Sequence, residues 1–232
     1  MESIKLKLTP QIIERANKFH VFREQCKSYL DRHNRCYDKF TIRPEHDTVI
    51  AYITENFVIK YLRGISKGRF SVGRWQDQFD LEYIANIVAK DSDIEEDINL
   101  VSSYFYDEFD IYISTPNSLS FVSLNIDVKT AMTKLDPQEN WDFLYPVVQV
   151  KDGAKDEVIL LTYYQVNETT DKFSTKNIVI VGYLTKQEIS ECEIVPKGSY
   201  TKHKTKSQTD NYLTRLEDYH SIQELIDNFI KL

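Results

Sequence analysis

The sequence has few cysteines, glycines and prolines. Its 232 residues include three cysteines, six glycines and six prolines. Cys26, Cys36 and Cys192 are too few and too widely spaced for a disulfide framework or a zinc site, and they fit a reducing compartment. A content of 41% hydrophobic and 28% charged residues is typical of a globular protein and excludes a fibrous or disordered chain.

Long apolar runs are also missing. No stretch approaches the ~20 apolar residues that a membrane-spanning helix needs. The first ten residues, MESIKLKLTP, lack the apolar run of a secretory signal. We therefore expect a cytoplasmic protein with no membrane segment.

Charge is distributed unevenly along the chain. The net charge of −7 argues against indiscriminate binding of nucleic acid, but residues 1–44 carry ten Lys and Arg against five Asp and Glu. Residues 77–110 carry eleven Asp and Glu against the single Lys90. This pattern fits a protein that holds phosphates in one region and cations in another, and it equally fits unevenly charged solvated faces.

Helical signals dominate the first 90 residues. Thr9 and Pro10 form an N-cap and a first-turn proline, which predict a long helix to about Asp38. We also expect helices at about Asp47–Arg63 and Leu81–Lys90, a loop over residues 64–76 and a solvated connection over the acidic residues 91–97.

From about Leu100 the hydrophobic period changes to two, which predicts strands. Phe109, Ile111 and Ile113 alternate with polar residues, and residues 122–129 repeat this alternation. We expect further strands at about 157–165 and 177–184, and helices that begin at the capping boxes TKQE (Thr185) and SIQE (Ser221). Together these elements predict one domain of the α/β (α+β) class, with a central mixed sheet flanked by helices.

Three polar residues on the first two predicted strands share one face. Asp127 and Lys129 point to one face of their strand, and the aliphatic residues at its even positions point to the other face. On the preceding strand, Asp110 likewise points to the face opposite that of Ile111. If the two strands form an antiparallel hairpin, Asp110 lies across from Asp127. This register requires paired residue numbers that sum to about 237, and therefore a loop of about six residues or a bulge.

Two carboxylates and one ammonium on a sheet surface suggest a cation site. Mg²⁺ prefers oxygen ligands and takes one or two protein carboxylates together with substrate phosphate. Lys129 could then orient or deprotonate an attacking water. The simpler interpretation is an exposed ion pair between Asp127 and Lys129, which would contribute little.

The segments FDIYI and LNIDVKTA resemble the PD-(D/E)xK motif of the restriction-endonuclease-like nucleases. The resemblance implies that Asp110 and Asp127 are metal ligands, that the main-chain carbonyl of Val128 is a third oxygen, and that Lys129 is the catalytic lysine. Phe109 stands where the family often has proline. The implied core spans residues 47–184, between an N-terminal helical extension (1–46) and a C-terminal elaboration (185–232).

The family often supplies a further acid from a helix that precedes this hairpin. Glu55 is the candidate because its helical neighbours, such as Val58, Ile59 and Leu62, are apolar. A carboxylate in such a stripe must be paired, protonated or ligating, since isolated burial is costly. A structural salt bridge of Glu55 is the alternative. Asp107 and Glu108 are the nearest rivals of Glu55 for the role of a further acid.

Two basic segments are candidates for contact with DNA. One is the polar loop of residues 197–208, with Lys202, Lys204 and Lys206, and the other is the loop of residues 64–76, with Arg69 and Arg74. Such residues would contact the phosphate backbone rather than read bases. Ordinary solvated loops would have the same composition.

The resemblance therefore implies a Mg²⁺-dependent endonuclease that cleaves double-stranded DNA. A type II restriction enzyme that acts as a homodimer is the expected form, since two sites are needed to cut both strands of a palindrome. A Holliday-junction resolvase, a nuclease of phage or transposon type and a non-cleaving DNA-binding protein on the same scaffold are the alternatives.

Overall fold

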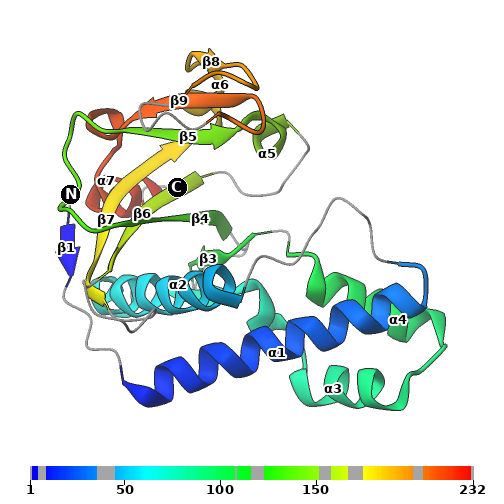
Figure 1. Cartoon of the computed structure of the whole chain (residues 1–232). Helices are drawn as coiled ribbons and strands as arrows, with labels where there is room; N and C mark the ends of the chain where they lie inside the picture. The colour runs from blue at the N-terminus through cyan, green and yellow to red at the C-terminus, as the bar shows by residue number, and fades with distance from the viewer. Residues whose placement is uncertain are drawn as a thin grey trace.

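The computed structural model contains one large twisted sheet, with the long helix α2 below it and a smaller sheet above it in Figure 1. The structure describes residues 2–4, 9–35, 45–107, 109–115, 123–151, 158–166, 175–200 and 206–230. Within these residues no helix has both the length and the apolar character needed to cross a membrane.

Six strands form the main sheet, in the order β1-β7-β6-β4-β3-β2. β4 and β6 are parallel and the other neighbours are antiparallel, so the predicted mixed sheet is confirmed. The strands are β1 Glu2–Ile4, β2 Ser71–Arg74, β3 Ile111–Ser114, β4 Ser123–Thr133, β6 Val158–Val166 and β7 Thr175–Thr185. Because β3 pairs only with residues 123–126, the rest of β4 has β6 on one side and no described strand on the other.

Both faces of the main sheet are covered. Ile126, Val128 and Leu160 on one face pack against α2 (Glu45–Ser66) and α7 (Ile222–Ile230). The opposite face packs against a three-stranded sheet of order β5-β9-β8. That sheet and its neighbouring helices are β5 Asp142–Pro146, β8 Ile194–Val195, β9 Asn211–Arg215, α5 Val147–Lys151, α6 Lys186–Ser190 and the 3₁₀ helix η2 Leu216–Asp218.

Three helices form a separate lobe beside α2 (Figure 1). They are α1 (Pro10–Arg32), α3 (Leu81–Lys90) and α4 (Glu95–Phe105). Their apolar stripes enclose a core of their own, which includes Tyr29 and Tyr104. The 3₁₀ helix η1 (Trp75–Gln78) connects β2 to this lobe.

Several predicted boundaries are confirmed. α3 has the predicted span, and the strands near 157–165 and 177–184 are β6 and β7. Both capping boxes form, with Thr185 bonded to Glu188 and Ser221 bonded to Glu224. α1 begins at Pro10 but ends at Arg32 rather than near Asp38, because Asn34 turns into the left-handed region at φ 55°.

Two stretches were predicted wrongly. Residues 91–97 are not only a connection, because α4 begins at Glu95. The helix continues to Phe105, although strand periodicity was expected from about Leu100. Its acidic first turn suits the positive end of the helix dipole. The predicted loop of residues 64–76 contains the end of α2, β2 and the start of η1. β2 is a strand because its backbone pairs with β3, a contact that composition does not reveal.

Candidate active site

The β3–β4 hairpin has the predicted register. Ile111 pairs with Ile126 and Ser114 pairs with Ser123, so the paired numbers sum to 237. The paired ladder ends at Ile111 and Ile126, and the N–H of Asp110 donates to the carbonyl of Ile126 at 3.2 Å, one residue out of the regular pattern. Asp110 still lies beside β4, with its side chain close enough to Asp127 to affect the ionisation of Asp127. Eight residues (115–122) separate the paired ends, rather than about six, and most of them lie outside the described residues.

Asp110 is held by the main chain of β4. The N–H of Val128 donates to Asp110 Oδ2 at 2.7 Å, just before the first residue of β3. The two main-chain polar groups of one strand residue point to the same side, so the Val128 carbonyl also faces the Asp110 side. Consistent with this alternation, the carbonyl of Lys129 points the other way and accepts a hydrogen bond from Thr162 Oγ1 at 3.1 Å.

Asp127 has two partners on the same oxygen. Lys129 Nζ lies 2.9 Å from Asp127 Oδ2, and the Tyr145 hydroxyl donates to the same atom at 2.7 Å. The side chains of Asp127 and Lys129 are only 14% and 17% exposed, so this pair is not the exposed surface pair that was the simpler interpretation of the sequence. Lys129 Nζ also lies 5.5 Å from the centre of the Tyr145 ring, which favours the cation.

The two aspartates differ in acidity although they are neighbours. Burial raises the pKa of Asp110 well above its ordinary value, and the negative charges of Glu55 and Asp127 add to this effect. Burial also opposes the ionisation of Asp127, but Lys129 and the Tyr145 hydroxyl outweigh it, so the pKa of Asp127 is lowered.

Glu55 joins this cluster from α2. It lies close enough to Asp110 to affect its ionisation, and its side chain is 15% exposed. Glu55 Oε2 is 3.7 Å from Arg74 Nη2, a separation longer than a hydrogen bond. The guanidinium of Arg74 lies 4.5 Å from the centre of the Tyr52 ring. The structure thus places Glu55 in the acidic cluster and gives it a basic neighbour.

Asp107 belongs to a second, partly exposed cluster. Arg23 Nη1 donates to both of its carboxylate oxygens, at 3.0 and 3.1 Å, and Gln76 Nε2 donates to Oδ1 at 2.9 Å. Arg23 Nη2 also donates to the carbonyl of Phe105 at 2.8 Å. Asp107 therefore ties α1 to the segment after α4. Glu108, the other acidic rival of Glu55, lies outside the described residues.

The predicted DNA-contact residues are scattered in the structure. Arg74 does not lie on an exposed loop, as the sequence suggested, because it ends β2 and is 6% exposed. Arg69 donates to the carbonyls of Ile65 and Ser66 at the end of α2, about 16 Å along the helix from Glu55. Lys206 is exposed and lies against the Tyr200 ring. Lys202 and Lys204 lie outside the described residues.

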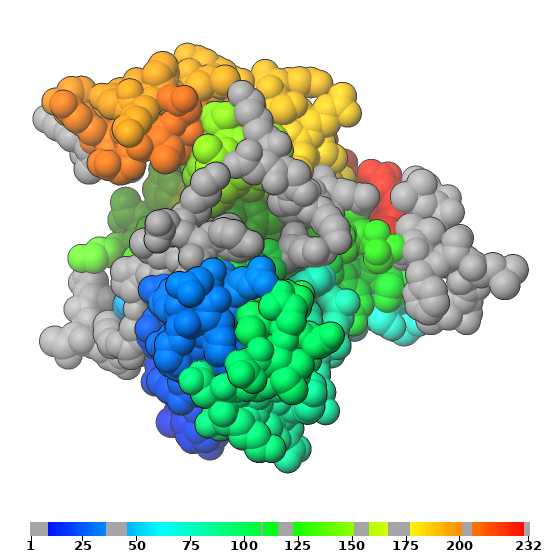
Figure 2. Space-filling model, turned by 90° about the vertical axis from the view of Figure 1, so that its right-hand side faces the viewer, coloured from blue at the N-terminus to red at the C-terminus, as the bar shows by residue number. Residues whose placement is uncertain are grey.

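A pocket of about 360 Å³ adjoins Lys129. It lies at the open edge of β4, between α2 on one side and β5 and α5 on the other. Figure 2 shows this side of the molecule, with the orange residues of the smaller sheet above, the blue and green helical lobe below, and green residues recessed between them. A ligand in this pocket would be in contact with the acidic cluster through Lys129.

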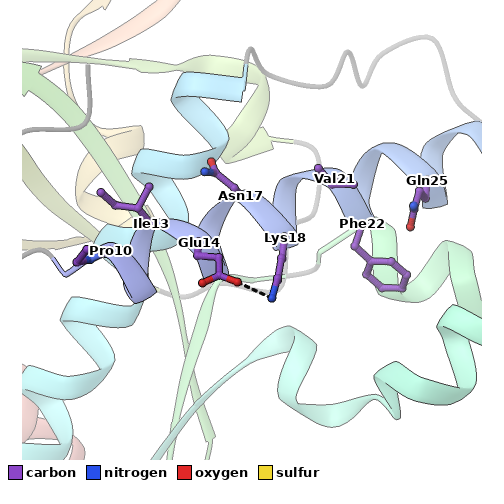
Figure 3. Close-up of a pocket in the computed structure, with 8 residues that line it drawn as sticks. All are labelled: Pro10, Ile13, Glu14, Asn17, Lys18, Val21, Phe22 and Gln25. Atoms are coloured by element: carbon purple, nitrogen blue, oxygen red, sulfur yellow. Dashed lines mark ion pairs between the residues drawn. The ribbon is translucent and has the colours of Figure 1, made fainter. Parts of the chain in front are cut away.

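A second pocket, of about 580 Å³, does not include any residue of the cluster. All of its lining residues belong to α1, as Figure 3 shows. Its charged members, Glu14 and Lys18, form an ion pair at 2.7 Å, one helical turn apart. This pocket is a shallow helix surface and offers no reactive groups.

The donor set of the cluster fits Mg²⁺. The described part of the chain contains no group of three or more His, Cys, Asp or Glu side chains that could hold a metal ion. Mg²⁺ requires only one or two carboxylates, with water and substrate oxygens as its other ligands. Asp110, Asp127 and the Val128 carbonyl meet that requirement, and burial of like charges gives the carboxylates reason to take up a cation.

Comparison of the chain with protein-family models, with curated proteins and with solved structures finds no match in any of the three. The nuclease resemblance therefore depends on the motif residues and on the geometry described above.

Sequence reasoning missed Tyr145 and misplaced Arg74. Tyr145 is one of 15 tyrosines, and only the pairing of β5 with β9 and its packing on the main sheet bring its hydroxyl to Asp127. The alternation of Trp141, Phe143 and Tyr145 was a usable strand signal. No pattern in the sequence distinguished Arg74 from the other basic residues of its segment.

Proposed function

We propose that the protein is a Mg²⁺-dependent endonuclease that hydrolyses phosphodiester bonds in double-stranded DNA, with a type II restriction enzyme acting as a homodimer as the preferred form. The observation that carries this proposal is the register of the β3–β4 hairpin. It brings Asp110 and Asp127 together and leaves Lys129 beside them at the open edge of β4. A hairpin with a different register would separate the two carboxylates.

Each side chain has a distinct task in this proposal. Asp110, Asp127 and the Val128 carbonyl would hold the ion, which supplies charge stabilisation at the scissile phosphate and a more acidic bound water. Tyr145 and Lys129 both engage Asp127 Oδ2, which leaves Oδ1 for the position shared with Asp110. Lys129, whose ammonium group contacts Asp127 Oδ2, would orient the attacking water by donating a hydrogen bond to it.

Access for the substrate supports the same proposal. Beyond Ile126 no described strand pairs with the β3 side of β4, and the pocket beside Lys129 opens there. A DNA strand could therefore bring a phosphate to the cluster without separating strands of the sheet. Arg74 and Glu55 would form the inner wall of this position, opposite the pocket.

Cleavage of DNA of known sequence with Mg²⁺ tests the proposal. We expect discrete fragments from the wild type and a rate about 10²–10⁴-fold lower for Lys129→Ala. Lys60→Ala, at an exposed position of α2, is the matched control and should cleave normally.

Unchanged cleavage by Lys129→Ala would refute the assignment of the site. Binding of DNA without cleavage by the wild type would favour the alternative of a DNA-binding protein on this scaffold. Preference for four-way junctions over linear duplex would favour a Holliday-junction resolvase. Sedimentation of the protein with and without DNA would test the homodimer.

A further inference from the structure

The pocket beside Lys129 has properties that phosphate hydrolysis alone does not need. It wraps around the open edge of β4, with Lys129 facing the β5 side and Thr130 and Met132 facing the α2 side. One of its residues belongs to the catalytic cluster, so a group bound there would be directly attached to, or next to, the reacting phosphate.

Two sides of the pocket carry apolar residues. Ile50 and Ala51 of α2 lie on one side, and Phe143 and Pro146 of β5 lie on the other. Met132 also lines the pocket, with 49% of its surface exposed, although it is a large apolar residue in a strand. A planar ring could stack on apolar and aromatic side chains of this kind.

Polar groups line the remaining side. Gln149 lines the pocket, and its Oε1 is buried without a hydrogen-bond partner in the part of the chain that the structure describes. Buried amide oxygens are normally bonded, so this atom indicates that a donor belongs nearby. Asp47, at the start of α2, adds a second acceptor at the pocket wall.

The edge of β4 offers main-chain groups as well. The N–H of Val128 points to this edge, so the main-chain groups of Thr130 and Met132 point to it too, because alternate strand residues share a side. No described strand pairs with this part of the edge. The pocket therefore has apolar side chains on which a ring could stack, together with hydrogen-bond donors and acceptors that could bind the polar edge of that ring.

We infer that this pocket binds the base of the nucleotide next to the scissile phosphate, turned out of the base stack. The volume of about 360 Å³ is in the range of pockets for small organic ligands. Enzymes that extrude a base hold it between apolar side chains and bond its polar edge, and this pocket offers both. The inference rests on the proposed function, because that function supplies the nucleotide.

A base held in this pocket restricts the kind of DNA that the enzyme can cleave. A base in this pocket cannot be stacked in a regular duplex, so the enzyme would act on DNA that it distorts or that is already unpaired near the cut. Single-stranded ends, mismatches and flexible steps cost less to open than a regular duplex. Cleavage should therefore be faster when the base beside the cut is unpaired.

The first experiment uses Met132 as a reporter. The chain has two methionines, Met1 and Met132, so protein labelled with ¹³C at the methionine methyl groups gives two signals, which Met132→Leu assigns. Titration with the four deoxynucleoside monophosphates should shift the Met132 signal in a saturable manner, since a stacked base changes the local ring current, and leave the Met1 signal in place.

Two variants show whether the response comes from the pocket. Ala51→Trp fills the pocket and should abolish the saturable shift. Gln149→Leu removes the buried amide and should weaken binding about tenfold. Val21→Trp introduces the same bulky side chain at an exposed position of α1 and should bind like the wild type.

The second experiment tests the base within DNA. Asp110→Asn is expected to bind DNA without cutting it, and Asp110 does not line the pocket. With 2-aminopurine placed at successive positions around the mapped cut, one position next to the scissile phosphate should become several-fold brighter on binding. Ala51→Trp added to Asp110→Asn should remove this increase.

The outcomes separate the two proposals. If the wild type cleaves DNA but neither the Met132 signal nor any 2-aminopurine position responds, the base pocket is wrong and the nuclease stands. If the Met132 signal responds but DNA is never cut, the nuclease is wrong and the pocket is a nucleotide site of another protein class. A response that survives Ala51→Trp overturns the pocket assignment in either case.

Discussion

Two clusters of charge lie a short distance apart in this protein, one around Asp107 and one around Asp110, and they are built differently. In the cluster around Asp107, one carboxylate meets one guanidinium, and Gln76 completes its hydrogen bonds. The other cluster contains three carboxylates, Glu55, Asp110 and Asp127, beside Lys129 and Arg74. In this cluster Arg74 Nε and Nη2 are buried without hydrogen-bond partners among the described residues.

The difference distinguishes a structural ion pair from a site. A buried charge pair is tolerated when its geometry is good and its lone pairs are satisfied. Asp107 with Arg23 meets this condition and needs nothing further. Burial raises the pKa of both Asp107 and Asp110, but only at Asp110 do neighbouring carboxylates, those of Glu55 and Asp127, raise it further. Such a grouping of like charges is stabilised by a ligand. The comparison makes three predictions, in order of decreasing effect.

The largest effect on the stability of the protein is expected from the cluster around Asp107. Asp107→Ala leaves the partly buried guanidinium of Arg23 without its carboxylate and should lower the free energy of unfolding by about 1.5–3 kcal/mol. Urea unfolding followed by circular dichroism measures this loss. The double variant Arg23→Met, Asp107→Leu should recover most of it, since no charge is then left unpaired. A loss below about 1 kcal/mol in the single variant would show that this pair does not hold the lobe together.

A smaller effect is expected from the hydroxyl that holds Asp127. Tyr145→Phe removes one hydrogen bond to a charged oxygen and should slow DNA cleavage about tenfold, with little change in fold. Tyr212→Phe is the matched control, because Tyr212 pairs directly with Tyr145 across β5 and β9. Equal rates for the two variants would remove Tyr145 from the site.

The smallest effect on stability is expected in the cluster around Asp110, and it is a gain. Asp110→Asn keeps an acceptor for the Val128 N–H but removes a buried negative charge, so it should raise the free energy of unfolding by about 1 kcal/mol near pH 7 and abolish cleavage.

The gain in Asp110→Asn should depend on pH in a defined direction. Because the pKa of Asp110 is raised in the folded protein, the wild type loses stability as pH rises above the ordinary carboxyl pKa of about 4 towards the raised pKa. Unfolding in urea at a series of pH values should show the difference between variant and wild type growing across that range. A difference that shrinks with rising pH would contradict the assigned direction.

Local patterns were enough for much of the fold. α3, both capping boxes, β6 and β7 follow from periodicity and from cap residues that act within a few positions. α4 was missed because its acidic first turn looks like a solvated linker in the sequence. β2, β5, β8 and β9 were missed because they are short, and pairing with distant strands, rather than their own composition, makes them strands.

For the site, the sequence by itself determined which residues share a face. Strand alternation fixes Asp127 and Lys129 opposite Ile126 and Val128 in any fold that keeps this strand. Tertiary structure decided the rest: the hairpin register that sets Asp110 against Asp127, the approach of Glu55, and the hydroxyl of Tyr145. Those contacts join residues far apart in the chain, and only the packing of α2 and β5 against the sheet brings them within reach of one another.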